Sequence, residues 1–349
     1  MKFVHPTVSL VLFPLVLLRC VSVNQAFSQQ PSAPDRPPII DMHVHATGWD
    51  HFGNPPPPNP LTGKVPTARA DKEFMDATLA ELKRYNVVKA VAGGPREHVS
   101  RWLAVDPGRI IGGTMIGARF DLPDVKVLRE DFRAGRLGVL GELGLQYAGV
   151  APNDQQMEPY WALAEELDIP VGLHTGLAPP RTPYTCCPKF RNPLGNPALV
   201  EEVLIRHPKL RVYLMHAGYP YLQETIAIMH MYPQVYVDLA AIDWLRPREA
   251  FHEYLRALVR EGFGKRLMFG SDQMIWPEGI GLAIEGIESA SFLTEEQKRD
   301  IFYNNAVRFL RLDEKKLARG SSNEGRHITT ACSVRAPACL LSVKIRARR

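Results

Sequence analysis

His43 and His45 stand one residue apart at the end of an apolar run. Side chains alternate along a β-strand, so both imidazoles would point to the same side and could bind one metal ion. Alone, the His-x-His pattern is a weak signal because it occurs by chance in many chains. It gains weight because other apolar runs also end at or just before residues of ligand type, namely Glu142, His174, His216 and Asp272.

The apolar runs alternate with amphipathic segments, which predicts strands and helices in turn and a parallel sheet buried on both faces. Eight strands, each followed by a helix, fit a (β/α)8 TIM barrel in number and size, with a doubly wound open sheet as the structural alternative. The predicted strands are 39–43, 87–92, 110–116, 138–143, 170–174, 211–216, 235–239 and 267–271, and the predicted helices are 72–85, 96–105, 124–134, 154–167, 197–207, 221–231, 248–261 and 295–311.

In a TIM barrel the carboxyl ends of the strands meet at one face, where active sites lie. All six candidate ligands fall at such ends, and burying their carboxylates without partners would be costly. The pattern therefore predicts one metal centre at the barrel mouth. A proline-rich insertion at residues 53–66 follows the first strand and is expected to form a lid or wall over that mouth.

The order His-x-His, Glu, His, His, Asp, with the motifs IDMHVH, HTG, HAG and FGSD, resembles the amidohydrolase superfamily, and more narrowly its amidohydrolase-related group. The resemblance extends over about residues 38–312 and is specific for the superfamily but not for the substrate. It implies a metal centre in which His43, His45 and Asp272 hold one ion and His174 and His216 hold a second.

Glu142 decides between two forms of this centre. Many relatives bridge two metal ions through a carboxylated lysine on the fourth strand, whereas others, such as the TatD-type nucleases, use a glutamate in a setting similar to residues 141–144 here. By this resemblance Glu142 would bridge two ions. If Glu142 is instead structural, His43, His45, His174 and Asp272 would bind a single ion, and His216 would be a nearby acid/base.

The implied activity is hydrolysis of an ester, lactone, amide or phosphoester bond of a small molecule by metal-activated water, with Asp272 and His216 as catalytic residues. Imidazole and carboxylate ligands favour Zn²⁺, with Mn²⁺, Fe²⁺ or Co²⁺ as alternatives. Two other functions stay open. One is a mononuclear decarboxylase of an aromatic or unsaturated acid, for which Arg181 is the candidate carboxylate-binding residue, and the other is a non-catalytic binding protein outside the cytoplasm.

The two ends of the chain differ in composition from the barrel. Residues 1–28 combine Lys2, an apolar run from Val8 to Leu18 and the small-x-small sequence Ala26-Phe27-Ser28, which predicts a cleaved signal peptide and a periplasmic or secreted protein without a stable membrane anchor. Residues 29–37 are expected to be a lead-in, residues 38–313 the barrel domain, and residues 314–349 a basic, disordered tail.

The formal net charge of +5 does not indicate a nucleic-acid partner, because residues 314–349 hold nine Lys or Arg against two Glu. The barrel itself is then mildly acidic, so binding to a phosphate backbone is not expected. A homo-oligomer stays open. Of the five cysteines, the adjacent Cys186 and Cys187 would close only a strained ring, so no disulfide framework is expected.

Overall fold

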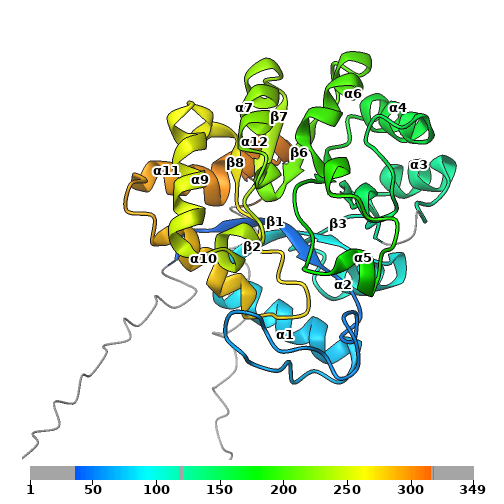
Figure 1. The fold of residues 1–349 in the computed structure, drawn as a ribbon. Helices are drawn as coiled ribbons and strands as arrows, with labels where there is room; N and C mark the ends of the chain where they lie inside the picture. Colours follow the sequence, from blue (N-terminus) through cyan, green and yellow to red (C-terminus); the bar gives the residue numbers. More distant parts are fainter. Residues whose placement is uncertain (1–35, 118–120, 316, 318–349) are drawn as a thin grey trace, which may run out of the picture. The chain divides into compact units, whose positions relative to one another are not determined.

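The computed structural model describes residues 36–117, 121–315 and 317. Within these residues, eight strands alternate with helices along the chain (Figure 1). The strands are β1 (Ile39–His45), β2 (Val87–Gly93), β3 (Ile110–Gly112), β4 (Leu140–Leu143), β5 (Val171–His174), β6 (Val212–Met215), β7 (Val235–Asp238) and β8 (Leu267–Met268). Their order agrees with the eight predicted runs.

All the strand pairs are parallel and join neighbours in sequence, in one sheet of order β1-β2-β3 and another of order β4-β5-β6-β7-β8. Two bridges, Gly113 to Val139 and Ile116 to Leu143, connect the sheets. On the other side, the amide of Met42 in β1 donates to the carbonyl of Phe269 just after β8, at 2.9 Å. The strands thus close into a ring, and the predicted TIM barrel is confirmed.

The predicted helices correspond to α1 (Asp71–Arg84), α2 (Arg96–Val105), α3 (Val125–Arg133), α4 (Glu158–Glu166), α6 (Glu201–Arg206), α7 (Leu222–Met231), α9 (Arg248–Arg260), and α11 (Glu295–Arg299), which continues through a π-helical turn (Asp300–Asn304) into α12 (Asn305–Leu310). Local sequence sets several of their starts. The Asn196 side chain accepts a hydrogen bond from the amide of Ala198, and Thr294 and Gln297 form the predicted capping box.

Three helices were not predicted from the sequence: α5 (Thr182–Thr185), α8 (Ile242–Leu245) and α10 (Gly279–Glu288). The first two are single turns. Helix α10 reads GIGLAIEGIE, a mostly apolar segment with three glycines, and glycine lowers helix propensity. Because most of its residues are buried, it lacks the one-sided apolar stripe by which amphipathic helices are recognised.

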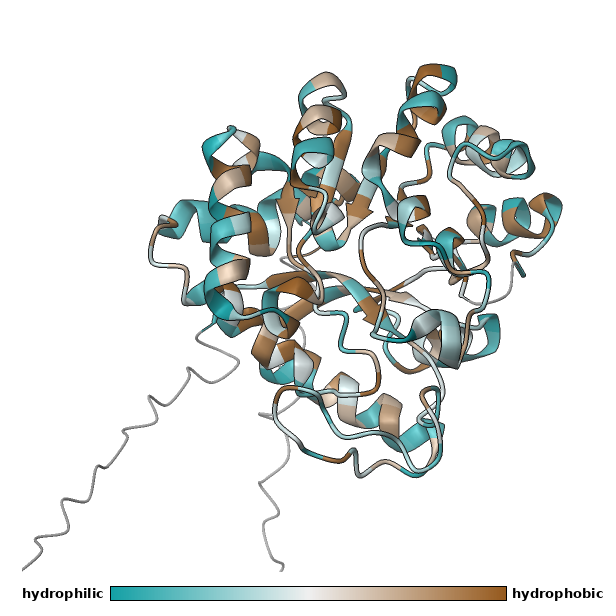
Figure 2. Ribbon diagram, viewed as in Figure 1, coloured by the Kyte–Doolittle hydropathy of each residue, from teal (hydrophilic) through white to brown (hydrophobic). Residues whose placement is uncertain are grey.

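Two sets of buried side chains form the core. The smaller set includes Ile40, Met42, Tyr213 and Met268 from the strands, together with Phe309 of α12. The larger set lies between the strands and the surrounding helices. Figure 2 shows hydrophobic residues along the strands and mixed hydrophilic and hydrophobic positions on the helices around them. The barrel therefore forms a rigid support for the residues at its strand ends.

The proline-rich loop after β1 packs against the segment after β8. The indole Nε1 of Trp276 donates to the carbonyl of Pro57 at 3.1 Å, and the amide side chain of Asn59 donates to Glu278 at 3.2 Å. The ring of Phe52 stacks on Trp276 with centroids 5.9 Å apart. The loop is thus fixed beside the segment that follows β8; its predicted role as a lid or wall over the mouth stays a prediction.

The predicted signal peptide 1–28, the lead-in up to residue 35 and nearly all of the tail 314–349 lie outside the described residues. Arg36 is already packed: it is 7% exposed, its guanidinium pairs with Glu288, and its carbonyl accepts a hydrogen bond from Asn86 at 2.6 Å. No helix among the described residues is long and apolar enough to cross a membrane.

Candidate metal centre

The six predicted ligands come from five different strand ends. His43 and His45 lie in β1, Glu142 in β4 and His174 at the end of β5, His216 follows β6, and Asp272 follows β8. Each of these residues is at most 7% exposed. Because the strands are parallel and their carboxyl ends converge, residues far apart in sequence meet in one buried cluster.

One half of the cluster contains His43, His45 and Asp272. The Nε2 atoms of His43 and His45 lie 3.3 Å apart, so the two imidazoles do point to the same side. The Nε2 of His45 is 3.0 Å from Oδ1 of Asp272, and that of His43 is 3.9 Å from the same oxygen. One ligand atom from each of the three residues lies within 4.8 Å of the others, as needed to hold one ion.

The other half contains His174, His216 and Glu142, whose ligand atoms also lie within 4.8 Å of one another. The imidazole rings of His174 and His216 meet edge to face with centroids 4.6 Å apart. The Nδ1 of His216 lies 2.9 Å from the carbonyl of Ala240, which fixes Nδ1 as the protonated nitrogen. The lone pair of His216 Nε2 is therefore left for an ion or a proton.

Glu142 is the residue shared by both halves. Its Oε2 lies 3.3 Å from Nε2 of His43 and 3.1 Å from Nε2 of His45. Its Oε1 lies 3.8 Å from Nε2 of His174. The two oxygens of one carboxylate thus face opposite halves of the cluster, which is the arrangement of a bridging ligand.

The electrostatics of the first half favour positive charge. Burial opposes the charged form of His45, but the carboxylates of Asp272 and Glu142 outweigh it and raise the pKa of His45 to about 9. The same carboxylates raise the pKa of the buried His43 above its ordinary value. Burial likewise opposes ionisation of Asp272, yet His43 and His45 hold its pKa at about 2.

His174 behaves in the opposite way. Burial, together with the neighbouring His216, lowers the pKa of His174 to about 3. The imidazole is therefore neutral at physiological pH, and a neutral imidazole is the form that binds a metal ion. The second half of the cluster thus offers the neutral nitrogen of His174 beside the ionised carboxylate of Glu142.

These residues fit one or two divalent cations. In a tetrahedral zinc site with metal–ligand distances of about 2.0–2.1 Å, neighbouring ligand atoms lie roughly 3.3 Å apart, close to the spacings among His43, His45, Glu142 and Asp272. A bound cation would also supply the positive charge that the buried carboxylates attract.

Three buried side chains that were not predicted from the sequence orient the ligands. Asp238 places Oδ2 3.3 Å from Nδ1 of His43. Gln273 accepts from the amide of His45 at 3.0 Å and donates to its carbonyl at 2.9 Å. Asp41 accepts from the amides of His43 and Ser271 at 3.0 and 2.9 Å. The available signal was a polar residue inside or beside an apolar strand.

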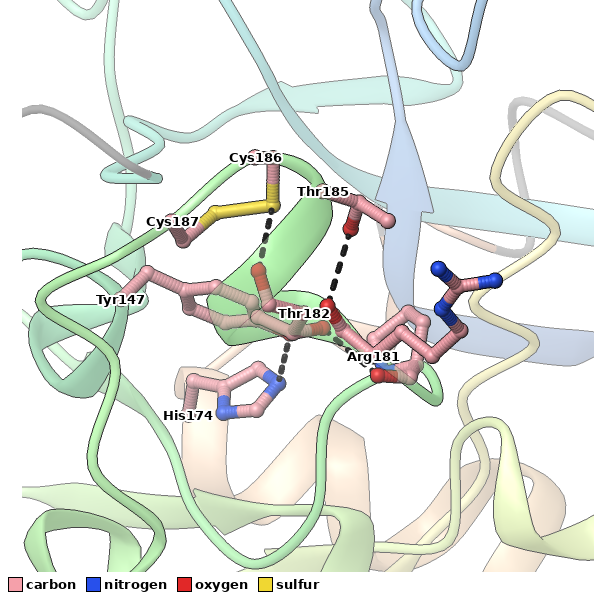
Figure 3. Close-up of a disulfide and its surroundings, with 8 residues drawn as sticks. Tyr147, His174, Arg181, Thr182, Thr185, Cys186 and Cys187 are labelled. Carbon is pink, nitrogen blue, oxygen red and sulfur yellow. Dashed lines mark hydrogen bonds between the residues drawn. A yellow bond between two sulfur atoms is a disulfide. The ribbon is translucent and has the colours of Figure 1, made fainter.

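Tyr147 is a further residue at the centre that the sequence did not reveal. It follows β4 in the short 3-10 helix η1 (Leu145–Tyr147), and its hydroxyl lies 3.3 Å from Nε2 of His174 (Figure 3). Burial, and then the charges of Glu142 and Asp272, raise the pKa of the Tyr147 phenol well above its ordinary value. Tyr147 therefore presents a protonated hydroxyl beside a candidate ligand.

The expectation that adjacent Cys186 and Cys187 would not pair, as part of no disulfide framework, is wrong, because the two are bonded to each other (Figure 3). Both lie at the end of the single helical turn α5, where their amides donate to the carbonyl of Thr182 at 3.3 and 3.1 Å. This turn brings the two adjacent sulfurs together, a geometry that sequence spacing alone does not indicate.

Arg181, considered as a carboxylate-binding residue, lies in the same loop after β5, where its side chain is exposed. Its carbonyl accepts hydrogen bonds from the amides of Tyr184 and Thr185 at 2.7 and 3.1 Å. The Arg181 guanidinium makes no contact with the six candidate ligands among the described residues, although Figure 3 places it in the loop that also carries the disulfide.

Similarity to solved structures supports the fold. An uncharacterised TIM-barrel protein from Bordetella bronchiseptica has a TM-score of 0.58 at 17% identity, covering 81% of this chain and 100% of that one. A probable 2-pyrone-4,6-dicarboxylic acid hydrolase from Acinetobacter baumannii has a TM-score of 0.54 at 16% identity, covering 78% and 99%. A 2,6-dihydroxybenzoate decarboxylase from Rhizobium has a TM-score of 0.53 at 15% identity, covering 79% and 100%.

Among curated proteins, the fluG protein of Emericella nidulans is 26% identical over 135 residues, which cover 34% of this chain and only 16% of that protein. The sequence model of the amidohydrolase family matches residues 40–312, which include all six candidate ligands. With that match and the geometry of the strand ends, the chain belongs to the amidohydrolase family of TIM-barrel enzymes.

Proposed function

We propose that this chain is a metal-dependent hydrolase that cleaves an ester, lactone, amide or phosphoester bond of a small molecule. The observation that carries the proposal is the position of Glu142, whose two carboxylate oxygens face His43 and His45 on one side and His174 on the other. A carboxylate shared in this way supports a centre of two ions. We propose Zn²⁺ as the metal because imidazole nitrogens and carboxylate oxygens suit it.

When bound, the metal supplies two things: it lowers the pKa of a coordinated water, and it polarises the oxygen of the bond to be cleaved. The chain's own residues handle the proton. Asp272 is held ionised by His43 and His45, so its carboxylate can accept the proton that the attacking water loses. His216 has its Nδ1 fixed on the carbonyl of Ala240, which leaves Nε2 to hold the second ion with His174, or to act as an acid/base if only one ion binds.

Decarboxylation of an aromatic or unsaturated acid is the competing function, and the fold comparisons do not separate the two, since a probable hydrolase and a decarboxylase are about equally similar. A decarboxylase would use one ion and a cation for the substrate carboxylate. Arg181, the candidate for that cation, is exposed on the loop after β5, so the bridging position of Glu142 is the observation that favours hydrolysis.

We place the enzyme in the periplasm or outside the cell, on the basis of the sequence of residues 1–28. The proline-rich wall beside β1 and β8 would then shape the pocket for the substrate. Loops of this kind determine substrate specificity in barrels.

The deciding experiment is the metal content per chain of the purified protein after reconstitution with Zn²⁺, compared with that of Glu142→Ala. Glu166→Ala is the matched control, because Glu166 is an exposed glutamate paired with Arg129. All three proteins are then assayed on lactones, esters, amides and phosphodiesters, and for CO2 release from aromatic acids.

Two ions per chain, reduced to one or none by Glu142→Ala but not by Glu166→Ala, together with hydrolysis, would support the proposal. One ion that is unaffected by Glu142→Ala would make Glu142 structural and, with CO2 release, establish the decarboxylase instead. A chain that binds no ion after reconstitution would overturn the metal centre altogether.

A further inference from the structure

The phenol of Tyr147 is held rigidly at the metal centre. The preceding residue, Gln146, is 1% exposed, and its side-chain amide donates to the carbonyl of Gly176 at 3.0 Å, which ties η1 to the loop after β5. The ring of Tyr147 lies between those of His174 and Phe190, with centroid distances of 5.0 and 5.3 Å. Two packed rings and an anchored backbone leave the hydroxyl little freedom.

The partner of this hydroxyl would change if an ion were bound at the centre. Its 3.3 Å contact is with Nε2 of His174 (Figure 3). That nitrogen is also the one that faces Glu142 and His216, so it is the atom that would bind an ion. A lone pair used for a cation no longer accepts from the phenol, whose O–H is then free for another acceptor.

The imidazole nitrogens that line the centre would not be free to donate once they serve as ligands. The Nε2 atoms of His43, His45 and His174 face the carboxylates of Glu142 and Asp272 and would serve as ligands. An oxygen that gains negative charge during hydrolysis is stabilised by a fixed donor in a water-poor site. Tyr147 is such a donor at the edge of the cluster.

We propose that the Tyr147 hydroxyl is a substrate-binding catalytic group, which donates a hydrogen bond to the substrate oxygen that becomes negatively charged during hydrolysis. This inference rests on the proposed metal-dependent hydrolysis. It assigns the phenol to oxyanion stabilisation, a role separate from metal binding and from proton transfer by Asp272.

The test measures the binding of inorganic phosphate, a tetrahedral oxyanion, to the full chain reconstituted with Co²⁺, using the visible absorption of the metal. Three proteins are compared: wild type, Tyr147→Phe and Tyr232→Phe. Tyr232 is the matched control because its hydroxyl also makes a single hydrogen bond, to Glu201 at 3.0 Å on the outer surface. Co²⁺ content and affinity are measured for each protein in the same titrations.

Loss of one hydrogen bond to a charged oxygen should weaken phosphate binding about 10- to 100-fold in Tyr147→Phe, with Co²⁺ content unchanged and Tyr232→Phe like wild type. Equal phosphate affinity in Tyr147→Phe and wild type would overturn the inference while leaving the metal centre intact. Loss of Co²⁺ affinity in Tyr147→Phe would also overturn it, since the phenol would then only position His174. Failure of the wild type to bind Co²⁺ would overturn the proposed function and this inference together.

Discussion

Asp238 is fully buried behind His43 and connects two parts of the metal centre. Its Oδ1 accepts from the amides of His216 and Ala240 at 2.7 and 3.2 Å, while its Oδ2 faces Nδ1 of His43 at 3.3 Å. A carboxylate behind a ligand imidazole fixes which nitrogen carries the proton and directs the other to the ion. Asp238 therefore orients His43 without itself lying at the open side of the cluster.

Asp238→Asn should lower Zn²⁺ affinity about 10- to 100-fold, because the amide no longer offers a charged acceptor to Nδ1 of His43. The affinity is measured by competition with a chelator. Asp243→Asn is the control: Asp243 is also fully buried, and burial raises its pKa well above the ordinary value, so an amide changes its charge little. Equal Zn²⁺ affinity in Asp238→Asn and wild type would refute the orienting role.

The individual ligand residues could be predicted from the sequence, but the residues that orient them could not. His43, His45, His174 and Asp272 stand at the ends of recognisable apolar runs and match family motifs. Asp238, Tyr147 and Gln273 carry no motif, and their roles depend on distances across the barrel that only the fold defines.

Among the elements, α2 and α3 are joined by one buried carboxylate. Asp131 in α3 is 1% exposed, and its oxygens accept from Arg96 of α2 at 2.7 and 3.0 Å and from Arg136 before β4 at 2.6 Å. Burial alone would raise the pKa of Asp131, but the hydrogen bonds from the two arginines outweigh burial and lower it. The pair of arginines thus stabilises the ionised form in the folded protein.

Asp131→Asn should reduce the free energy of unfolding by about 1 kcal/mol near neutral pH; the estimate is modest because both arginines are partly exposed. A lowered pKa stabilises the fold above the ordinary value of 3.8 and loses that contribution as pH falls through the folded pKa. The difference between variant and wild type should therefore shrink below about pH 4.

Urea unfolding across this pH range measures the effect. Asp76→Asn provides the comparison, since Asp76 pairs with Lys72 on an exposed face of α1 and should change stability little. A difference between Asp131→Asn and wild type that stays constant down to acidic pH would show that the charge of Asp131 is not responsible.

The sequence predicted these elements where they are amphipathic and failed where they are not. Helix α9 has a clear apolar side with Phe251, Leu255 and Leu258 buried, and its predicted bounds differ from the observed ones by one residue. Helix α10 is buried nearly throughout and was missed. Helix prediction from periodicity requires an exposed face, and α10 has little of one.

At the scale of the whole barrel, closure between β1 and the segment after β8 depends strongly on Gln273. Its side chain, fully buried, bonds both the amide and the carbonyl of His45, and the amide of Asp272 donates to the carbonyl of His43 at 2.8 Å. Strand β8 itself contains only two residues, so side-chain bonds replace part of the missing strand ladder.

Gln273→Ala should cost about 2 kcal/mol of stability, because it leaves two buried backbone groups of His45 without partners. It should also weaken Zn²⁺ binding, since His45 and Asp272 would separate. Thermal unfolding and chelator competition measure the two effects. Gln156→Ala, at an exposed glutamine, should alter neither quantity. A Gln273→Ala protein with the stability and Zn²⁺ affinity of the wild type would show that the Gln273 side chain does not hold β1 to the segment after β8.

His45 and Gln273 stand 228 positions apart in the chain, and the six candidate ligands come from five of the eight strand ends. Contacts between residues so far apart in sequence form late in folding, because closing the long intervening loop first costs conformational entropy. A partly folded chain would not bring these ligands together, so an ion bound at this centre would select molecules that have finished folding. If the protein is exported as proposed, an ion bound only by the folded barrel would stabilise that state against unfolding and proteolysis and would leave partly folded chains unprotected.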